Sequence, residues 1–192
     1  MSGLKKIVVF DFDKTLTCND TLFGFFTEFK SRGLIVKKAA YLFCQVLAKI
    51  GFISNSVLKD VGLKLFIDEA SDLEINEKSL SYSKKICFSD LKSQLDQDTD
   101  FIAIVVTASF ECYVRHCFNE NILVIGSTIE RTGGRVKLRN NCFGEVKVER
   151  LKLNGIQRID KFYTDSESDL PVAAISNVVY FVKSGSVVKI KG

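Results

Sequence analysis

Two aspartates separated by one residue follow the first apolar run of the sequence. Asp11 and Asp13 lie in the segment DFDKT at residues 11–15, directly after an apolar, β-branched stretch. Two carboxylates this close repel each other, and burying either of them away from water is costly. A bound Mg²⁺ would relieve both costs, because it is a hard cation that prefers oxygen ligands. The alternative is a pair of acids that face water at the end of a strand.

Further polar side chains follow later apolar runs in the same way. Thr107 ends one run with a hydroxyl, whereas Asp165 and Asp169 lie in TDSESD, where the alternative role of an acid is to cap a helix. Lys147 lies in GEVK, where taken alone it is typical of a solvated surface lysine. Ligands of open α/β sheets bind beyond the carboxyl ends of the strands. We therefore expect these groups to meet at one site for Mg²⁺ and a phosphate.

The composition leaves little room for other catalytic chemistry. The chain has 192 residues, a net charge of +4, six cysteines and a single histidine, His116. A Ser-His-Asp or Cys-His relay would depend on that one residue, and a multi-His metal site is excluded. The cysteines form no C-x-x-C pair, which favours six unpaired thiols. The basic residues form no stripe or known motif, so nucleic-acid binding is not expected.

Apolar runs alternate with helical patterns along most of the chain, which predicts the elements that position these side chains. The strand-like runs are residues 5–12, 101–106, 122–125, 162–163 and 178–182. The helical patterns between and after them are residues 110–120, 144–154 and 169–175. This alternation predicts an α/β fold with a Rossmann-like, doubly wound parallel sheet. Residues 128–139 and 178–190 predict hairpins that turn at Gly133-Gly134 and at Ser184-Gly185.

The segment between the first two strands has a different pattern. Residues 17–99 contain no strand-like run, and they predict a series of helices at residues 20–32, 35–50, 54–66 and 71–85. A crossover between parallel strands needs only about a dozen residues. We therefore expect an all-helical cap at residues 17–99, inserted into an α/β core formed by residues 1–16 and 100–192.

Four motifs together resemble a known family. DFDKT, VVTAS, GEVK and TDSESD, in this order and spacing, resemble the motifs of the haloacid dehalogenase (HAD) superfamily of phosphohydrolases. The helical insertion and the stretches DFDKTLT and GEVKVERL are similar to the subfamily that contains phosphoserine phosphatase. The resemblance implies a HAD-like core with a helical cap and a Mg²⁺-dependent phosphatase that hydrolyses a phosphate monoester.

The resemblance also implies a role for each residue of the motifs. Asp11 would be the nucleophile that forms an aspartyl-phosphate. Asp13 would protonate the leaving alcohol and then activate the water that hydrolyses the intermediate. Thr107 and Lys147 would bind the phosphoryl oxygens.

The resemblance further implies a metal site and a specificity residue. Asp165 would hold Mg²⁺ together with Asp11 and the main-chain carbonyl of Asp13, and Asp169 would support that site. Asp20 matches the position at which phosphoserine phosphatases have a glutamate that helps to read the amino acid moiety of the substrate.

The expected substrate is a small phosphorylated metabolite or a phosphorylated head group. The segment CNDTLFGFF resembles subfamily members that act on phosphatidylglycerophosphate, so a lipid phosphatase at the membrane surface is one alternative. A catalytically idle interaction module with a HAD fold is another. The sequence shows no signal peptide and no run of about 20 apolar residues, so we expect a cytoplasmic protein.

The first half of the predicted cap is basic and rich in phenylalanine. Residues 21–67 hold seven Lys or Arg against two acids, and seven of the sixteen phenylalanines. A basic amphipathic lobe of this kind is able to lie on an anionic membrane surface. The favoured interpretation is that Phe23, Phe26, Leu42 and Phe43 form the core of the cap itself, because apolar stripes at helical spacing usually pack inward.

Overall fold

A mixed seven-stranded sheet forms the centre of the structure, a computed structural model that describes residues 5–29, 33–97, 100–183 and 185–192. The strand order is β4-β3-β2-β1-β5-β6-β7, with parallel pairing from β3 to β6 and antiparallel strands at both edges. The strands are β1 (Lys6–Phe10), β2 (Phe101–Phe110), β3 (Leu123–Thr132), β4 (Arg135–Asn140), β5 (Ile159–Thr164), β6 (Ser176–Lys183) and β7 (Ser186–Lys191). The predicted α/β fold with a parallel sheet is confirmed.

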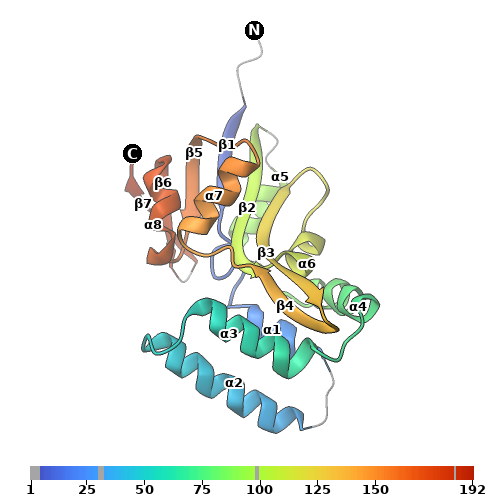
Figure 1. Cartoon of the computed structure of the whole chain (residues 1–192). Helices are drawn as coiled ribbons and strands as arrows, with labels where there is room; N and C mark the ends of the chain where they lie inside the picture. The colour runs from blue at the N-terminus through green and yellow to red at the C-terminus, as the bar shows by residue number, and fades with distance from the viewer. Residues whose placement is uncertain (1–4, 30–32, 98–99, 184) are drawn as a thin grey trace.

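The central strands are apolar on both sides because helices cover both faces of the sheet. Val8 and Val9 of β1 point to opposite faces, and both are buried, each in a separate hydrophobic cluster. The parallel strands β2, β1 and β5 end at the same edge of the sheet, and this edge faces α1 and α3 in Figure 1. The residues that follow these strands are therefore brought together.

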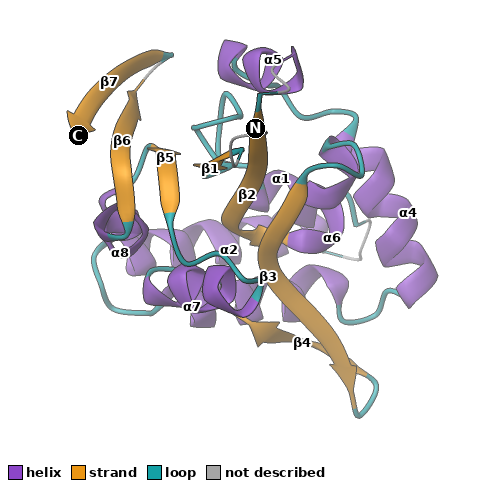
Figure 2. Ribbon diagram, turned by 90° about the horizontal axis from the view of Figure 1, so that it is seen from above, coloured by secondary structure: helices purple, strands orange, loops and turns teal. Residues whose placement is uncertain are grey.

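Helices surround the sheet and extend beyond its carboxyl edge (Figures 1 and 2). The inserted segment forms α1 (Leu22–Thr27), α2 (Leu34–Lys49), α3 (Asn55–Gly62), a π-helical turn η1 (Leu63–Ile67), α4 (Asp72–Ser83) and α5 (Asp90–Gln97). The later segments are α6 (Glu111–Val114), η2 (Arg115–Cys117), α7 (Glu145–Leu153), η3 (Glu167–Asp169) and α8 (Leu170–Ala174). Helix α5 was not predicted from the sequence, and it lies beside β2 rather than with α1, α2 and α3 (Figure 1).

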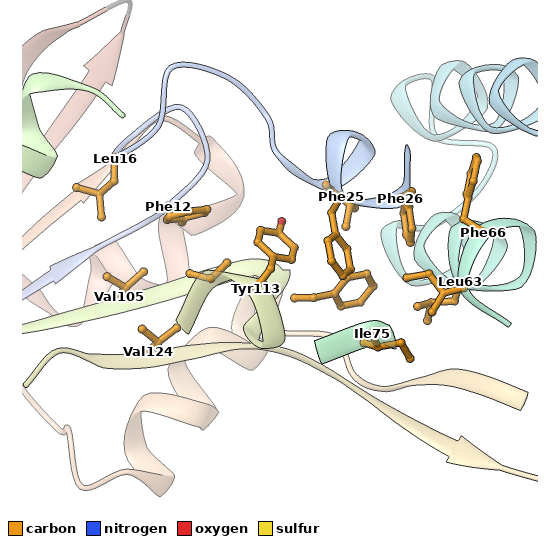
Figure 3. Close-up of a cluster of buried hydrophobic side chains, with 14 of the residues drawn as sticks. Phe12, Leu16, Phe25, Phe26, Leu63, Phe66, Ile75, Val105, Tyr113 and Val124 are labelled. Carbon is orange, nitrogen blue, oxygen red and sulfur yellow. The ribbon is translucent and has the colours of Figure 1, made fainter. Parts of the chain in front are cut away.

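A cluster of aromatic rings joins the inserted helices to the sheet (Figure 3). The ring of Phe25 in α1 lies 4.6 Å from that of Tyr113 in α6, and the ring of Phe26 lies 5.8 Å from that of Phe110. On the other side, Phe26 stacks on Phe66 at 5.7 Å. Such pairs add roughly 0.5–1.5 kcal/mol each beyond the area that they bury. Helix α1 is thus fixed against the part of the sheet that ends in the predicted catalytic motifs.

The outermost helix, α2, corrects the predicted core of the cap. Phe26 is fully buried and Phe23 is half-buried, as expected, but Leu42 is 47% exposed and Phe43 is 64% exposed. Helix α2 attaches to the other helices through the buried ring of Tyr41, which stacks on Phe23 and meets Phe26 edge to face. The opposite face of α2 has no layer of the described chain over it, so the inward packing predicted for Leu42 and Phe43 is wrong.

The structure also corrects the prediction of six unpaired thiols. Cys18 and Cys87 form a disulfide, 69 residues apart in the sequence. The pair joins the segment between β1 and α1 to the segment between α4 and α5, and the Cys18 backbone N–H donates to the Cys87 carbonyl at 2.9 Å. No spacing motif marks such a pair, because proximity comes from the tertiary fold. Within the described residues, no helix is both long and apolar enough to cross a membrane.

Candidate active site

A buried lysine lies between two carboxylates at the carboxyl edge of the sheet. Asp11 directly follows β1, and its backbone N–H donates to the Tyr163 carbonyl of β5 at 2.8 Å, which fixes the end of the strand. Lys147 of α7 places its Nζ 2.7 Å from Asp11 Oδ1 and 2.7 Å from Asp169 Oδ1. The Thr164 hydroxyl donates to the other oxygen of Asp169 at 2.8 Å. The chain therefore neutralises part of a buried negative charge with one cation.

The protonation state of Asp11 depends on its burial and on the neighbouring Lys147. Burial raises the pKa of Asp11 to about 7, the nearby Asp169 adds to the rise, and Lys147 opposes it. The two carboxylates in turn hold the pKa of Lys147 above its usual value against the effect of burial. Lys147 thus stays an ammonium ion, able to neutralise Asp11 or a phosphoryl group beside it.

The second aspartate of the first motif is held by donors from two different elements. Asp13 Oδ1 accepts from the Thr21 hydroxyl at 2.6 Å and from the Thr21 backbone N–H at 2.8 Å, and Oδ2 accepts from the Ser109 hydroxyl at 2.5 Å. Thr21 is in turn hydrogen-bonded to the Tyr113 hydroxyl at 2.8 Å, while the Tyr82 hydroxyl donates to the Thr21 carbonyl at 2.7 Å. Burial raises the pKa of Asp13 to about 6, while these hydrogen bonds lower it.

These predicted residues line one cavity of about 160 Å³. Its lining includes most of the residues predicted from the motifs: Asp11, Asp13, Asp20, Lys147, Asp165 and Asp169. Thr107 does not line it. Thr107 is buried and its hydroxyl accepts the Ser109 backbone N–H at 3.0 Å, while the neighbouring Ala108 lines the cavity instead. The phosphate-binding role of Thr107 stays a prediction.

The oxygen donors of this cavity fit Mg²⁺. Burial raises the pKa of Asp165, and the nearby Lys14 opposes this rise only in part. No group of three or more acid, His or Cys side chains in the described residues is arranged to hold a metal ion. Mg²⁺ does not need such a group, because it is usually bound by one or two carboxylates, with water and substrate phosphate completing its shell. Asp11 and Asp165 both line this cavity, and with the Asp13 carbonyl they would be the smaller set that the motifs predict.

A larger cavity of about 670 Å³ shares part of its lining with the first. The residues common to both are Lys14, Asp20, Asn55 and Phe143. Asn55, at the start of α3, was not predicted as a site residue. Its Oδ1 is buried with no hydrogen-bond partner in the described structure, which is costly unless a ligand supplies a donor. A lone asparagine at a helix start gives no signal in the sequence beyond its preference for caps.

A second lysine was also missed by sequence reasoning. Lys59 of α3 is only 1% exposed, and its Nζ donates to the Ala108 carbonyl, the Ser127 hydroxyl and Asn141 Oδ1. Burial lowers the pKa of Lys59 to about 7. The side chain therefore ties the inserted helix α3 to β2, to β3 and to the residue after β4, rather than offering a free cation to the cavity.

Comparison with solved structures places this arrangement in a known fold. A protein of unknown function from Bordetella pertussis matches with a TM-score of 0.68, 17% identity, and coverage of 90% of this chain and 87% of that one. A HAD family hydrolase from Salmonella enterica serovar Typhi matches with a TM-score of 0.63, 12% identity, and coverage of 89% and 60%. A phosphoserine phosphatase, solved as an analogue of its phospho-aspartyl intermediate, matches with a TM-score of 0.59, 18% identity, and coverage of 92% and 86%.

The similarity is one of fold rather than of sequence. No protein-family model matches the chain, and no curated protein matches it. The chain has the fold of HAD-type phosphatases, as the four motifs imply.

Proposed function

We propose that this protein is a Mg²⁺-dependent phosphatase that hydrolyses a phosphate monoester through an aspartyl-phosphate. The observation that carries the proposal is the buried ion pair of Asp11 with Lys147, in a cavity that Asp13 and Asp165 also line. Burying Lys147 together with the carboxylates of Asp11 and Asp169 is costly for stability. A reaction on an anionic substrate explains why these charges are present. The solved phospho-aspartyl analogue of a phosphoserine phosphatase with this fold supports the same chemistry.

In the first step, an Asp11 carboxylate oxygen forms a bond to phosphorus while the bond from phosphorus to the alcohol oxygen breaks. Lys147 Nζ, held 2.7 Å from Asp11 Oδ1, orients the carboxylate and neutralises charge on the phosphoryl oxygens. Mg²⁺ bound by Asp11, Asp165 and the Asp13 carbonyl would supply further charge neutralisation and alignment. Asp13 gives its proton to the leaving alcohol.

In the second step, Asp13 takes a proton from a water molecule whose oxygen bonds to phosphorus. The bond between phosphorus and the Asp11 oxygen breaks, which releases inorganic phosphate and restores the carboxylate. A group that serves as acid and then as base works best with a pKa near the working pH, and the pKa of Asp13 is raised to about 6. Thr21 and Ser109 keep its carboxylate in one orientation.

The larger cavity is the proposed site of the leaving group. Polar side chains from the inserted helices, Gln45, Lys49 and Asn55, line it together with Phe23 and Phe143. This mixture suits a small phosphorylated metabolite or a phosphorylated head group. Asp20 and Asn55 lie at the junction of the two cavities and are our proposed specificity residues.

Hydrolysis of p-nitrophenyl phosphate tests the proposal. We expect turnover with Mg²⁺ that is lost with EDTA and lost in Asp11→Asn, which keeps the shape of the side chain. Asp160→Asn is a matched control, because Asp160 lies in β5 away from the residues that line either cavity. Wild-type protein without turnover in the presence of Mg²⁺ would favour an idle HAD-fold module, and full turnover of Asp11→Asn would refute the proposed nucleophile.

A further inference from the structure

Helix α2 carries an apolar face that points away from the rest of the protein. Its exposed apolar side chains, together with those of the segment that follows, are Ile35, Val36, Leu42, Phe43, Val46, Ile50 and Phe52. Ile35, near the start of the helix, is 84% exposed, and Phe52, in the segment after it, is 77% exposed. Residues 35, 39, 42, 46 and 50 follow helical spacing, so they form one continuous stripe. Contiguous exposed apolar surface of this kind marks an interaction site.

The position of α2 explains why the other described residues do not cover this face. The helix forms the outermost layer of the molecule, with α1 and α3 between it and the sheet (Figure 1). Its buried contacts run through Tyr41, on the opposite side of the helix, whose ring meets Phe23, Phe26 and Phe66. Leu34, Cys44 and Ala48 pack beside this aromatic anchor, while the large apolar side chains of the other side of the helix are exposed.

The charge of α2 distinguishes between two binding partners for this face, a second copy of the protein and an anionic lipid membrane. Helix α2 contains Lys37, Lys38 and Lys49 and no acidic residue. Lys38 and Lys49 lie about three turns apart, on the same edge of the apolar face. Two copies of the helix packed face to face would bring these lysines together with no acid on either copy of α2 to pair with them, which disfavours self-association. An anionic surface with an apolar interior matches both the lysines and the stripe.

We propose that the outer face of α2 docks on an anionic lipid membrane, with Phe43 and Val46 entering the interface and Lys38 and Lys49 contacting lipid head groups. The same helix contributes Gln45, Ala48 and Lys49 to the larger cavity. The docking does not depend on the proposed phosphatase activity, because Lys38, Phe43 and Val46 line neither cavity; Lys49 lines only the larger one.

Vesicle sedimentation with the full chain tests this surface. We expect the wild type to sediment with vesicles of equimolar phosphatidylcholine and phosphatidylglycerol, and not with pure phosphatidylcholine vesicles. Raising the salt from about 0.1 M to about 0.5 M should weaken binding, because it screens the lysines. Phe43→Ser with Val46→Ser should reduce the affinity by about tenfold for each side chain replaced, from the transfer free energy of a partly buried apolar side chain.

A matched double variant removes exposed apolar side chains elsewhere on the protein, and it tests whether the effect is specific to α2. Leu73→Ser with Leu153→Ser replaces side chains that are 69% and 81% exposed on α4 and α7, and it should sediment like the wild type. Both double variants should keep wild-type turnover of p-nitrophenyl phosphate, which shows that they fold. Equal sedimentation of Phe43→Ser/Val46→Ser and the wild type, or no sedimentation of either, overturns the proposal. A wild-type dimer in light scattering that this variant converts to a monomer also overturns it, in favour of a second copy on the face.

Discussion

Replacing Lys147 by methionine should destabilise the folded protein strongly, apart from any effect on catalysis. Lys147 Nζ lies 2.7 Å from Asp11 Oδ1 and 2.7 Å from Asp169 Oδ1. At an effective dielectric constant of about 20, a pair of unit charges at this distance attracts by about 6 kcal/mol. Desolvation of the three buried groups offsets much of this attraction, but Lys147→Met leaves two facing carboxylates buried without a cation. Breaking a buried pair in this way costs about 3–5 kcal/mol.

Urea unfolding at pH 7.5 in EDTA measures this cost directly. Lys152→Met is the matched control, because Lys152 is exposed on the same helix, and it should change the free energy of unfolding by less than about 0.5 kcal/mol. The double variant Lys147→Met/Asp169→Asn should recover part of the loss, since it removes the repulsion between the two carboxylates. A free energy of unfolding for Lys147→Met within about 1 kcal/mol of the control would refute the idea that Lys147 balances the buried charge of Asp11 and Asp169.

Three further predictions concern groups around the site. Thr21→Val removes a hydroxyl that lowers the pKa of Asp13, so the limb of the p-nitrophenyl phosphate pH profile assigned to Asp13 should move to higher pH, and Thr21→Ser should restore it. Burial lowers the pKa of Lys59 to about 7, so between about pH 7 and 10 the unfolded chain binds a proton that the folded chain lacks. The free energy of unfolding should therefore rise with pH across this interval by up to about 1.4 kcal/mol per unit, and Lys59→Met should abolish that rise in urea titrations. Gly62→Ala would place a methyl carbon 2.3 Å from the buried ring of Phe26, so thermal unfolding should show a loss of about 1–3 kcal/mol.

The sheet and the order of its motifs were predictable because their signals are local. A strand such as β1, buried on both faces, reads as an unbroken apolar run, and the polar residues that follow it mark the carboxyl edge. Asp11 and Asp169 were identified in this way, and Lys147 was identified as a cation at the start of a helix near the same edge. The structure brings the lysine within ion-pair distance of both carboxylates. Helix α5 was missed because its polar sequence, DLKSQLDQ, contains few apolar residues to show a period.

The supporting contacts of the site were not predictable, because they depend on tertiary packing and most of them join residues that are distant in the sequence. The hydrogen bond from Thr21 to Asp13 depends on how the chain enters α1. The hydrogen bond between Thr21 and Tyr113 joins residues 92 positions apart. The disulfide between Cys18 and Cys87 and the anchoring of Lys59 on Ala108 are of the same kind. Each depends on the packing of inserted helices against the sheet, which no local period encodes.

Helix α2 shows a different limit of sequence reasoning. An apolar stripe at helical spacing establishes that one face of a helix avoids water, but the spacing is the same whether that face meets its own chain or another surface. Whether the apolar face is buried depends on whether another layer of helices lies outside α2. With α1 and α3 lying between α2 and the sheet, the described chain has no further helix to cover Phe43 and Val46, so only Tyr41 and its neighbours pack inward (Figure 1). Helix α2 has lysines and no acid. For a helix inside a protein core, this composition would not indicate a partner. Because the stripe faces outward, the same composition favours an anionic partner.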